Sequence, residues 1–251
     1  MPVISTVLGW VLEKSILIMN NVLVMIEQAP FASLSKIWFT TFEYVLVYAA
    51  IICAAYFLLG RKARLLQISL SLLLVACISS SFKKYNAMNT GEACFFNLRK
   101  HSGIVFKHGD KAVILSDLPF TDKNYQYSIQ PYLDSAKVAD TTVCSLAKNI
   151  SSPFLIKRDN LICFGNIKVL FFNRQLENIK LLRKLKVNYL LLTGSPHIAI
   201  ADLINNYQFN TLVIDCNNAD RLITGWEKQA NACHIKYHCL KRNISLVVAS
   251  N

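Results

Sequence analysis

The sequence predicts an integral membrane protein whose last two thirds form a basic α/β domain, with mixed sheets covered by helices. Three observations predict this class. The first 82 residues carry few charges, long apolar runs lie within them, and the later segments alternate between period-two and helical patterns. With 251 residues, 53% of them hydrophobic, the chain can hold a membrane part and one α/β domain of normal size.

Charged residues are distributed unevenly along the chain. Before residue 83 they are limited to Glu13, Lys14, Glu27, Lys36, Glu43, Arg61, Lys62 and Arg64. This density is too low for the surface of a water-soluble fold, so we expect this part to lie in lipid. From residue 83 on, 22 Lys and Arg stand against 12 Asp and Glu, a formal charge of +10. Such a field attracts nucleic acid, anionic lipid or an acidic protein alike.

Residues 1–29 predict a helix with a narrow polar stripe. Polar side chains recur every seven residues, at Thr6, Glu13, Asn20 and Glu27, and Pro30 ends the pattern. Two interpretations stay open. The helix lies along the membrane interface with the stripe in water, or it is a membrane helix whose stripe lines a pore or packs on polar partners.

Residues 30–82 predict two transmembrane helices. Every residue from 44 to 59 is apolar, and together with 37–42 this run reaches the roughly 20 residues that span a bilayer. Gly60 and the basic cluster of Arg61, Lys62 and Arg64 form a turn to a second apolar run at 65–82. Basic residues favour the cytoplasmic side of a membrane, but these three cations are matched in number by Lys36, Lys83 and Lys84 on the other side. Because the three in the turn lie close together and next to both helix ends, we expect this turn inside the cell and residues 83–251 outside.

Residues 83–251 predict a single α/β domain. We expect strands at 93–98, 103–107, 111–116, 141–146, 161–164, 167–172, 188–193, 211–214, 235–240 and 244–249. Helices are expected at 121–136, 174–186, 198–207 and 219–232. A meander followed by alternating strands and helices favours mixed sheets covered by helices.

Two polar turns are typical of helix caps. Ser195 followed by Pro196 predicts the start of the helix after strand 188–193. The turn Asp215-Cys216-Asn217-Asn218 offers capping side chains for the next helix, and an acidic catalytic role for it would need a partner that the sequence does not reveal.

The eight cysteines include no C-x-x-C pair, and most of those in the domain stand in apolar strand contexts that predict buried free thiols. One compact set of metal-ligating types exists: Cys233, His234, His238 and Cys239. On a strand both histidines would project from the face opposite Cys239, so a metal site there needs a distorted backbone. We therefore expect no metal and no other cofactor.

Clustered cations give the candidates for nucleic-acid contact. One cluster comprises Arg99, Lys100 and His101 with Lys107, and the other, on the expected helix 174–186, comprises Lys180, Arg183, Lys184 and Lys186. Phosphate contacts require only clustered cations, so a solvated helix face or anionic lipid explains the same pattern.

The order of these segments resembles the C-terminal end of the ComEC family, the bacterial competence DNA-uptake channel. The resemblance covers residue 30 to the end and rests on the apolar helix pair followed by FFNLRKHSGIVFKHGDKAVILSD, YSIQPYL, NYLLLTGSPH, LVIDCNN and Trp226. It implies a metallo-β-lactamase-like domain in the bacterial inner membrane. The family's channel core and N-terminal domain are not in this sequence, so we expect a truncated or separately encoded C-terminal piece.

The family's metal motif, T-H-x-H-x-D-H after an apolar strand, is degenerate here. Leu192 and Thr193 match the strand end, but the four ligand positions hold Gly194, Pro196, Ile198 and Ala199. The G-x-G-D-type turn is likewise replaced, by the segment 98–103, which has no acidic residue. A dinuclear zinc site needs those imidazoles and carboxylates, so the resemblance carries over the scaffold and not the hydrolase chemistry.

The resemblance therefore implies a non-catalytic membrane component of DNA uptake. Its partners would be DNA, the lipid bilayer, and other channel subunits or the missing channel core. Two alternatives stay open: a structural module that contacts anionic lipid or another subunit without touching DNA, and a residual metal-dependent nuclease or hydrolase that uses the Cys/His set.

Overall fold

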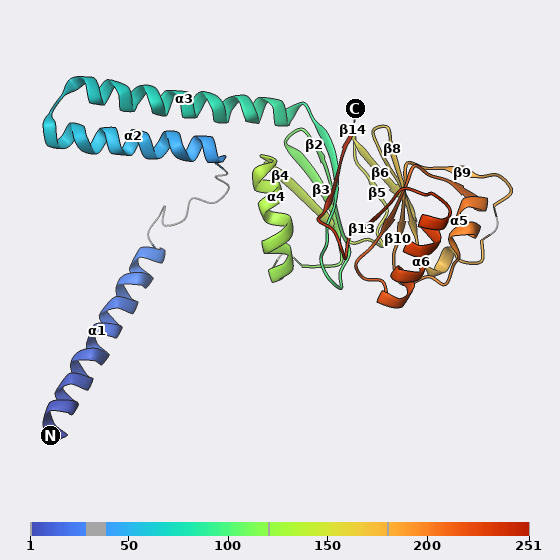
Figure 1. Cartoon of the computed structure of the whole chain (residues 1–251), viewed down its shortest axis with the longest axis horizontal. Coiled ribbons are helices and arrows are strands. Elements are labelled where there is room, and N and C mark those ends of the chain that lie inside the picture. Colours follow the sequence, from blue (N-terminus) through green and yellow to red (C-terminus); the bar gives the residue numbers. More distant parts are fainter. Residues whose placement is uncertain (1, 29–38, 120, 180, 251) are drawn as a thin grey trace. The chain divides into compact units, whose positions relative to one another are not determined.

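The computed structural model of the chain describes residues 2–28, 39–119, 121–179 and 181–250 (Figure 1). It comprises two units, and the first, Met1–Trp38, is represented by one long helix, α1 (Pro2–Gln28). Its stretch Gly9–Ile26 is long and apolar enough to cross a membrane. The interfacial and the pore-lining interpretations of its polar stripe both stay predictions.

The second unit begins with a helical hairpin. Helices α2 (Thr41–Gly60) and α3 (Ala63–Met88) are each long and apolar enough to cross a membrane. Arg61, in the left-handed region at φ 47°, makes the tight turn between them. The small side chains Ala50 and Ser69 are buried between the helices, and Ser69 Oγ donates to the carbonyl of Ala50 at 2.9 Å.

A polar cluster closes the open end of this hairpin. Glu43 is buried, and its carboxylate accepts hydrogen bonds from Lys83 Nζ at 2.9 Å, from Ser79 Oγ at 3.0 Å and from the backbone N–H of Thr40 at 2.8 Å. A charge within an apolar helix is tolerated when it is paired in this way. Helix α3 runs six residues beyond the expected end at 82 and reaches Met88.

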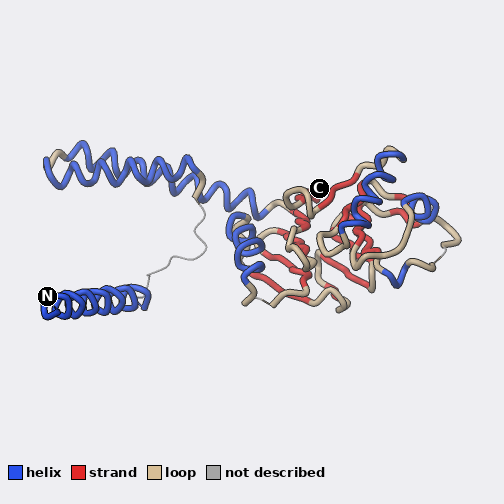
Figure 2. The backbone as a smooth tube through the Cα atoms, turned by 60° about the horizontal axis from the view of Figure 1, so that its bottom comes forward, coloured by secondary structure: helices blue, strands red, loops and turns tan. Residues whose placement is uncertain are grey.

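Two β-sheets follow, packed face to face between helices (Figures 1 and 2). The first, in the order β14-β1-β2-β3-β4, consists of β1 (Gly91–Phe95), β2 (Gly103–His108), β3 (Lys111–Ser116), β4 (Asp140–Cys144) and β14 (Leu246–Ser250). The second, in the order β13-β12-β10-β8-β7-β6-β5, consists of β5 (Ile150–Ser151), β6 (Leu155–Arg158), β7 (Leu161–Phe164), β8 (Ile167–Phe172), β10 (Tyr189–Leu192), β12 (Thr211–Ile214) and β13 (Tyr237–Cys239).

A short parallel pair joins β9 (Leu185–Lys186) to β11 (Tyr207–Gln208). The helical elements of the domain are a π-helical turn (Tyr125–Ile129), α4 (Gln130–Ser135), a 3₁₀ turn (Arg174–Leu176), α5 (Ile200–Asn206) and α6 (Asp220–Ala232).

Three hydrophobic cores hold the four layers together. Between the sheets, Phe106 of the first packs near Phe164 of the second, with ring centroids 5.4 Å apart. Ile129 and its neighbours cover the outer face of the first sheet, and Trp226 of α6 covers that of the second. Both faces of each sheet are therefore buried, which explains the apolar runs in their strands. The predicted fold class, an α/β domain of mixed sheets and helices preceded by long apolar helices, is confirmed.

The predicted helix at 174–186 is wrong. Only Arg174–Leu176 is helical, as a 3₁₀ turn, and Leu185–Lys186 is the strand β9. The apolar residues of this segment do not form one packed face, because Leu185 packs on the outer core while Leu182 is fully exposed. Pairing of β9 with β11 overrides the helical pattern.

The strands β5 and β6 are additional to the predicted set. In β6 the side chains alternate between buried and exposed, so Leu155 and Lys157 point inward and Ile156 points outward. This pattern is hidden in the sequence because the inward position holds a lysine and the outward one an isoleucine. The predicted strands 161–164 and 167–172 are confirmed as β7 and β8, with Phe164 paired to Ile167 across the turn that contains Gly165.

Candidate functional site

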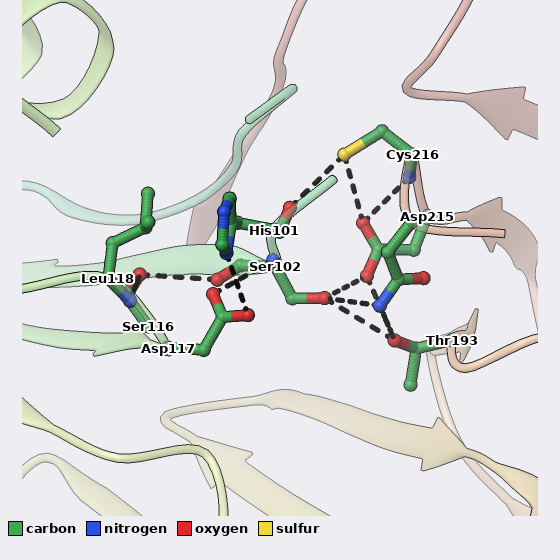
Figure 3. Close-up of polar contacts among 9 residues, drawn as sticks. His101, Ser102, Ser116, Asp117, Leu118, Thr193, Asp215 and Cys216 are labelled. Carbon is green, nitrogen blue, oxygen red and sulfur yellow. Dashed lines mark hydrogen bonds and ion pairs between the residues drawn. The ribbon is translucent and has the colours of Figure 1, made fainter. Parts of the chain in front are cut away.

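Polar side chains from both large sheets meet at one edge of the domain (Figure 3). Thr193 follows β10 and Asp215 follows β12, and these strands are parallel neighbours, with Leu192 paired to Ile214. Their ends therefore lie side by side, as ligand-binding residues do in open α/β sheets. Ser102, directly before β2 of the first sheet, reaches the same point.

The carboxylate of Asp215 is the centre of this arrangement. Asp215 is 1% exposed, and its Oδ2 accepts hydrogen bonds from Ser102 Oγ and, at 2.9 Å, from Thr193 Oγ1. Its Oδ1 accepts from the backbone N–H of Cys216 at 2.8 Å. We call the set Ser102, Thr193, Asp215 and Asn217 the strand-end network.

Asn217 completes the strand-end network. Its Nδ2 donates to Ser102 Oγ and to Thr193 Oγ1, both at 2.9 Å, and its Oδ1 accepts from the N–H of Gly194 at 3.2 Å. Each hydroxyl thus donates to the carboxylate and accepts from the amide. The network ties the first sheet to the second without a charged partner for Asp215.

Both predicted helix caps are wrong. Helix α5 begins at Ile200, and Ser195 Oγ instead accepts from the N–H of Ala219 at 3.0 Å. Asn218 does not cap α6: its Oδ1 accepts from Ser195 N–H at 2.7 Å and its Nδ2 donates to the carbonyl of Leu192 at 2.7 Å. These bonds hold the turn in which Gly194 and Ser195 both have positive φ, at 74° and 55°.

Burial controls the protonation of the strand-end network. It raises the pKa of Asp215 above the ordinary aspartate value, although the hydrogen bonds from Ser102, Thr193 and Cys216 favour the ionised form and oppose this shift. Burial, together with the charge of Asp215, raises the pKa of the Cys216 thiol to about 12. Cys216 is therefore a protonated thiol, whose Sγ lies 3.2 Å from the carbonyl oxygen of His101, and it is not a nucleophile.

A second carboxylate fixes the turn before β2. Asp117 Oδ1 accepts from the N–H of Ser102 at 3.2 Å, and Asp117 Oδ2 lies 3.2 Å from Nδ1 of His101 (Figure 3). Arg99 in the same turn has φ 61°, and its N–H donates to Asn97 Oδ1 at 3.2 Å. The predicted contact residues Arg99, Lys100 and His101 therefore project from a rigid turn beside the strand-end network.

The side chains of Arg99 and Lys100 are exposed and make no ion pair or hydrogen bond with the residues that the structure describes. Lys107, which the sequence predicts as a further DNA-contact residue, is buried instead of exposed. It is 1% exposed, and its Nζ donates to the carbonyl of Ala87 at 2.8 Å and to Thr90 Oγ1 at 3.1 Å. Lys107 thereby anchors the end of α3 to β2.

The second cation cluster is not on a helix. Lys186 belongs to β9, Arg183 and Lys184 precede it, and Lys180 lies outside the described residues. These residues come before β10, whereas Thr193 follows it, so the two cation clusters lie at opposite ends of this strand.

The loop in which the sequence places the degenerate metal motif contacts the strand-end network directly. Gly194, Pro196, Ile198 and Ala199 offer no metal ligand, and the backbone N–H of His197 donates to Glu177 Oε1 at 2.6 Å. Within the described residues, no three His, Cys, Asp or Glu side chains are grouped to hold a metal ion. The residues at this edge do not fit a dinuclear zinc site, because saturated hydroxyl, amide and carboxyl contacts stand where its ligands would be.

The Cys/His set at 233–239 is spread over different environments. Cys233 is exposed after α6, Cys239 is buried, and His238 Nε2 lies 2.9 Å from the carbonyl oxygen of Ile244. Sequence reasoning singled out this set and missed the strand-end network. The available signal was that Thr193 and Asp215 each directly follow an apolar strand, which places them at one edge if the strands are parallel neighbours.

We predict that replacing Asp215 with Asn removes a pH-dependent part of the stability. Because the folded-state pKa of Asp215 is raised, the folded protein keeps this proton at pH values where the unfolded chain has lost it. The contribution of Asp215 to the free energy of unfolding therefore falls as pH rises from about 4, the ordinary aspartate pKa, towards the pKa of Asp215 in the folded protein.

The measurement is the thermal unfolding midpoint of the full chain in detergent at several pH values between 4 and 8, with near-ultraviolet circular dichroism as the signal that monitors unfolding. The midpoint of the natural chain minus that of Asp215→Asn should decline with rising pH. Asp202→Asn, a change at an exposed position on α5, should follow the natural chain. A difference that stays constant over the whole range contradicts the prediction.

Comparison with known proteins identifies the domain. A family model described as the ComEC C-terminal domain matches residues 93–250, from within β1 to the end of β14, and so covers more than half of the chain and both large sheets. No curated protein matches the chain. The chain belongs to the ComEC C-terminal domain family, and this membership, with its three apolar helices, links it to competence DNA uptake at the bacterial inner membrane.

Proposed function

We propose that the chain is a non-catalytic part of a competence-type DNA-uptake channel and that its basic domain guides DNA through phosphate contacts. Residues 30–82 are the membrane-spanning pair in this proposal, and residues 83–251 form the DNA-guiding domain. The bilayer and other channel subunits are its further partners, with residues 1–29 as an additional helix on or in the membrane.

The strand-end network is the observation that carries the non-catalytic role. A hydrolase at this edge would need ligands that expose a metal-bound water to substrate. Ser102 and Asp215 are instead 3% and 1% exposed, and each oxygen that they offer is already hydrogen-bonded. The network acts as a link between the sheets rather than as a reactive centre.

The turn that carries Arg99 and Lys100 supports the DNA contact. Two exposed cations without acidic partners in the described part of the chain stand on a backbone fixed by Asp117 and Asn97. Because the backbone of this turn is already fixed, binding a phosphate there does not require ordering of the loop, which would otherwise reduce the affinity. The cluster of Arg183, Lys184 and Lys186, at the other end of β10, is a second place for such contacts.

The hairpin turn supports a membrane orientation with the sheet domain outside the cell. Arg61 and Lys62 form the turn and Arg64 lies in the first turn of α3, so three cations are concentrated at one membrane face. The positive-inside tendency places this face in the cytoplasm. The sheet domain, which follows the opposite end of α3, then lies outside, where incoming DNA arrives.

For DNA binding, we predict a salt-dependent affinity that the double variant Arg99→Glu and Lys100→Glu weakens. The full chain in zwitterionic nanodiscs is titrated with fluorescent single-stranded and duplex oligonucleotides at several salt concentrations. Each lost phosphate contact should reduce the slope of log K against log salt by about 0.7 for single strands and about 0.9 for duplex.

The matched control is the pair Lys168→Glu and Lys228→Glu, which changes the charge equally at exposed positions on β8 and α6. It should leave the salt slope unchanged. Affinity without any salt dependence rules out phosphate contacts. Binding only to vesicles that contain anionic lipid would instead favour a membrane-contacting module.

For catalysis, we predict that the purified full chain produces no metal-dependent cleavage of DNA with Zn²⁺, Mn²⁺ or Mg²⁺. The variants Asp215→Asn and His238→Gln, purified in parallel, identify contamination, because a contaminating nuclease cleaves equally in all samples, whereas activity of the strand-end network or of the Cys/His set is lost in one of the variants. Cleavage by the natural chain that either variant lacks would overturn the non-catalytic role.

For orientation, we predict that Cys233, which is exposed in the domain, reacts with a membrane-impermeant maleimide in intact spheroplasts. A cysteine introduced by Arg61→Cys should react only after permeabilisation. Cys233→Ser is the control for the first signal. The reverse pattern of labelling would place the domain in the cytoplasm.

A further inference from the structure

We infer that the cavity beside Lys157 is a phosphate site, which takes either a backbone phosphate of DNA or free inorganic phosphate. The DNA source rests on the proposed function, whereas the site itself rests on the contacts of Lys157. The cavity measures about 380 Å³ and is lined by polar side chains that include Asn160, Asn173, Gln175 and Thr193. A second cavity of about 380 Å³ lies against Lys157 and Arg158.

Lys157 is a buried cation with an incomplete set of partners. The inward position in β6 leaves the residue 2% exposed, and Nζ donates to the carbonyl of Asp159 at 2.7 Å. Among the described residues no carboxylate lies within ion-pair distance of it. An ammonium group has three N–H donors, so two stay available for a ligand or water in the adjoining cavities. A buried charge needs such partners because desolvation disfavours it strongly.

Lys107 is also buried, but partners within the chain compensate its charge. Its Nζ donates to the carbonyl of Ala87 and to Thr90 Oγ1, at the C-terminal end of α3. Unpaired carbonyls and the helix dipole make that end negative, which compensates the charge. Lys157 lies at no helix end, its Nζ has one hydrogen-bond acceptor among the described residues, and the carboxylate of Asp159 acts on it only from beyond ion-pair distance. Its charge therefore points to a partner from outside the chain.

The side chains around Lys157 are suited to an anion with several acceptor oxygens. The side-chain amide of Asn160 makes no hydrogen bond with described residues, and Nδ2 of Asn173 reaches only Gln175 Oε1, at 3.5 Å. Amide and ammonium donors match phosphate oxygens. The acidic residue in the cavity wall, Asp159, is exposed, and its Oδ1 lies 3.4 Å from Nδ2 of Asn149.

The cavity is continuous with the site described above. Thr193 lines it and also belongs to the strand-end network, beside which the turn of Arg99 and Lys100 projects. If the proposed function holds, the strand that contacts this turn also supplies the phosphate at Lys157.

The test uses the full chain in zwitterionic nanodiscs and two probes: inorganic phosphate against chloride at matched ionic strength, and a fluorescent oligothymidine. Lys157→Met keeps the apolar stem and removes the charge, and Asn160→Leu serves as a second variant that keeps Lys157. Lys168→Met, at an exposed position on β8, is the control.

We expect phosphate to raise the unfolding midpoint of the natural chain and of Lys168→Met but not of Lys157→Met. Oligothymidine affinity should fall about tenfold in Lys157→Met, as expected for loss of a charge-assisted hydrogen bond, and less in Asn160→Leu.

The outcomes separate the two proposals. Loss of the phosphate effect without any DNA binding by the natural chain supports a site for free phosphate and overturns the proposed function. DNA binding that neither variant weakens, with no phosphate effect, overturns the phosphate site and leaves the proposed function standing. If Lys157→Met does not fold, the same criteria apply to Asn160→Leu.

Discussion

The domain depends on how its two sheets are joined at the edge where polar side chains meet. Apolar packing alone holds the sheets over most of their area, through Phe106 and Phe164 among others. At the strand ends the chain leaves the sheets, and a buried carboxyl group stands in place of apolar side chains. Asp215 is acceptable there because hydroxyl and amide donors surround it, and an unpaired carboxylate at 1% exposure would be strongly unfavourable.

The strand-end network also shows how the loops at this edge are joined where the described residues offer no group of metal ligands. A metal ion joins several loops by binding ligands from each of them. Here Ser102 of the first sheet, Thr193 and Asp215 of the second, and the amide of Asn217 connect the loops at this edge through hydrogen bonds. The positive φ angles of Gly194 and Ser195 are then held by side chains rather than by coordination.

The positively charged residues of the domain have two different roles, one for buried lysines and one for exposed cations. Two of the lysines that the structure describes are buried: Lys107 satisfies the end of α3, and Lys157 adjoins polar cavities. The exposed cations, by contrast, surround the domain and include Arg99 and Lys100 on a fixed turn. The net charge of +10 that the sequence gives for the domain does not distinguish these roles. A buried lysine that anchors the end of a helix and an exposed cation on the surface count equally in it. Lys107, predicted as a contact residue, shows this directly.

The sequence by itself determined the apolar hairpin, the meander, the β7–β8 turn and the loss of metal ligands at 194–199, since these depend on local pattern and residue chemistry. It failed at 174–186, where pairing of Leu185–Lys186 with Tyr207–Gln208, 22 residues further along the chain, overrode a helical period. It also left Asp215 without a partner, because Ser102 is 113 residues distant along the chain. Only the tertiary structure decided which polar residues meet, since hydrogen-bond partners across two sheets are set by strand order and register, which neighbouring residues do not encode.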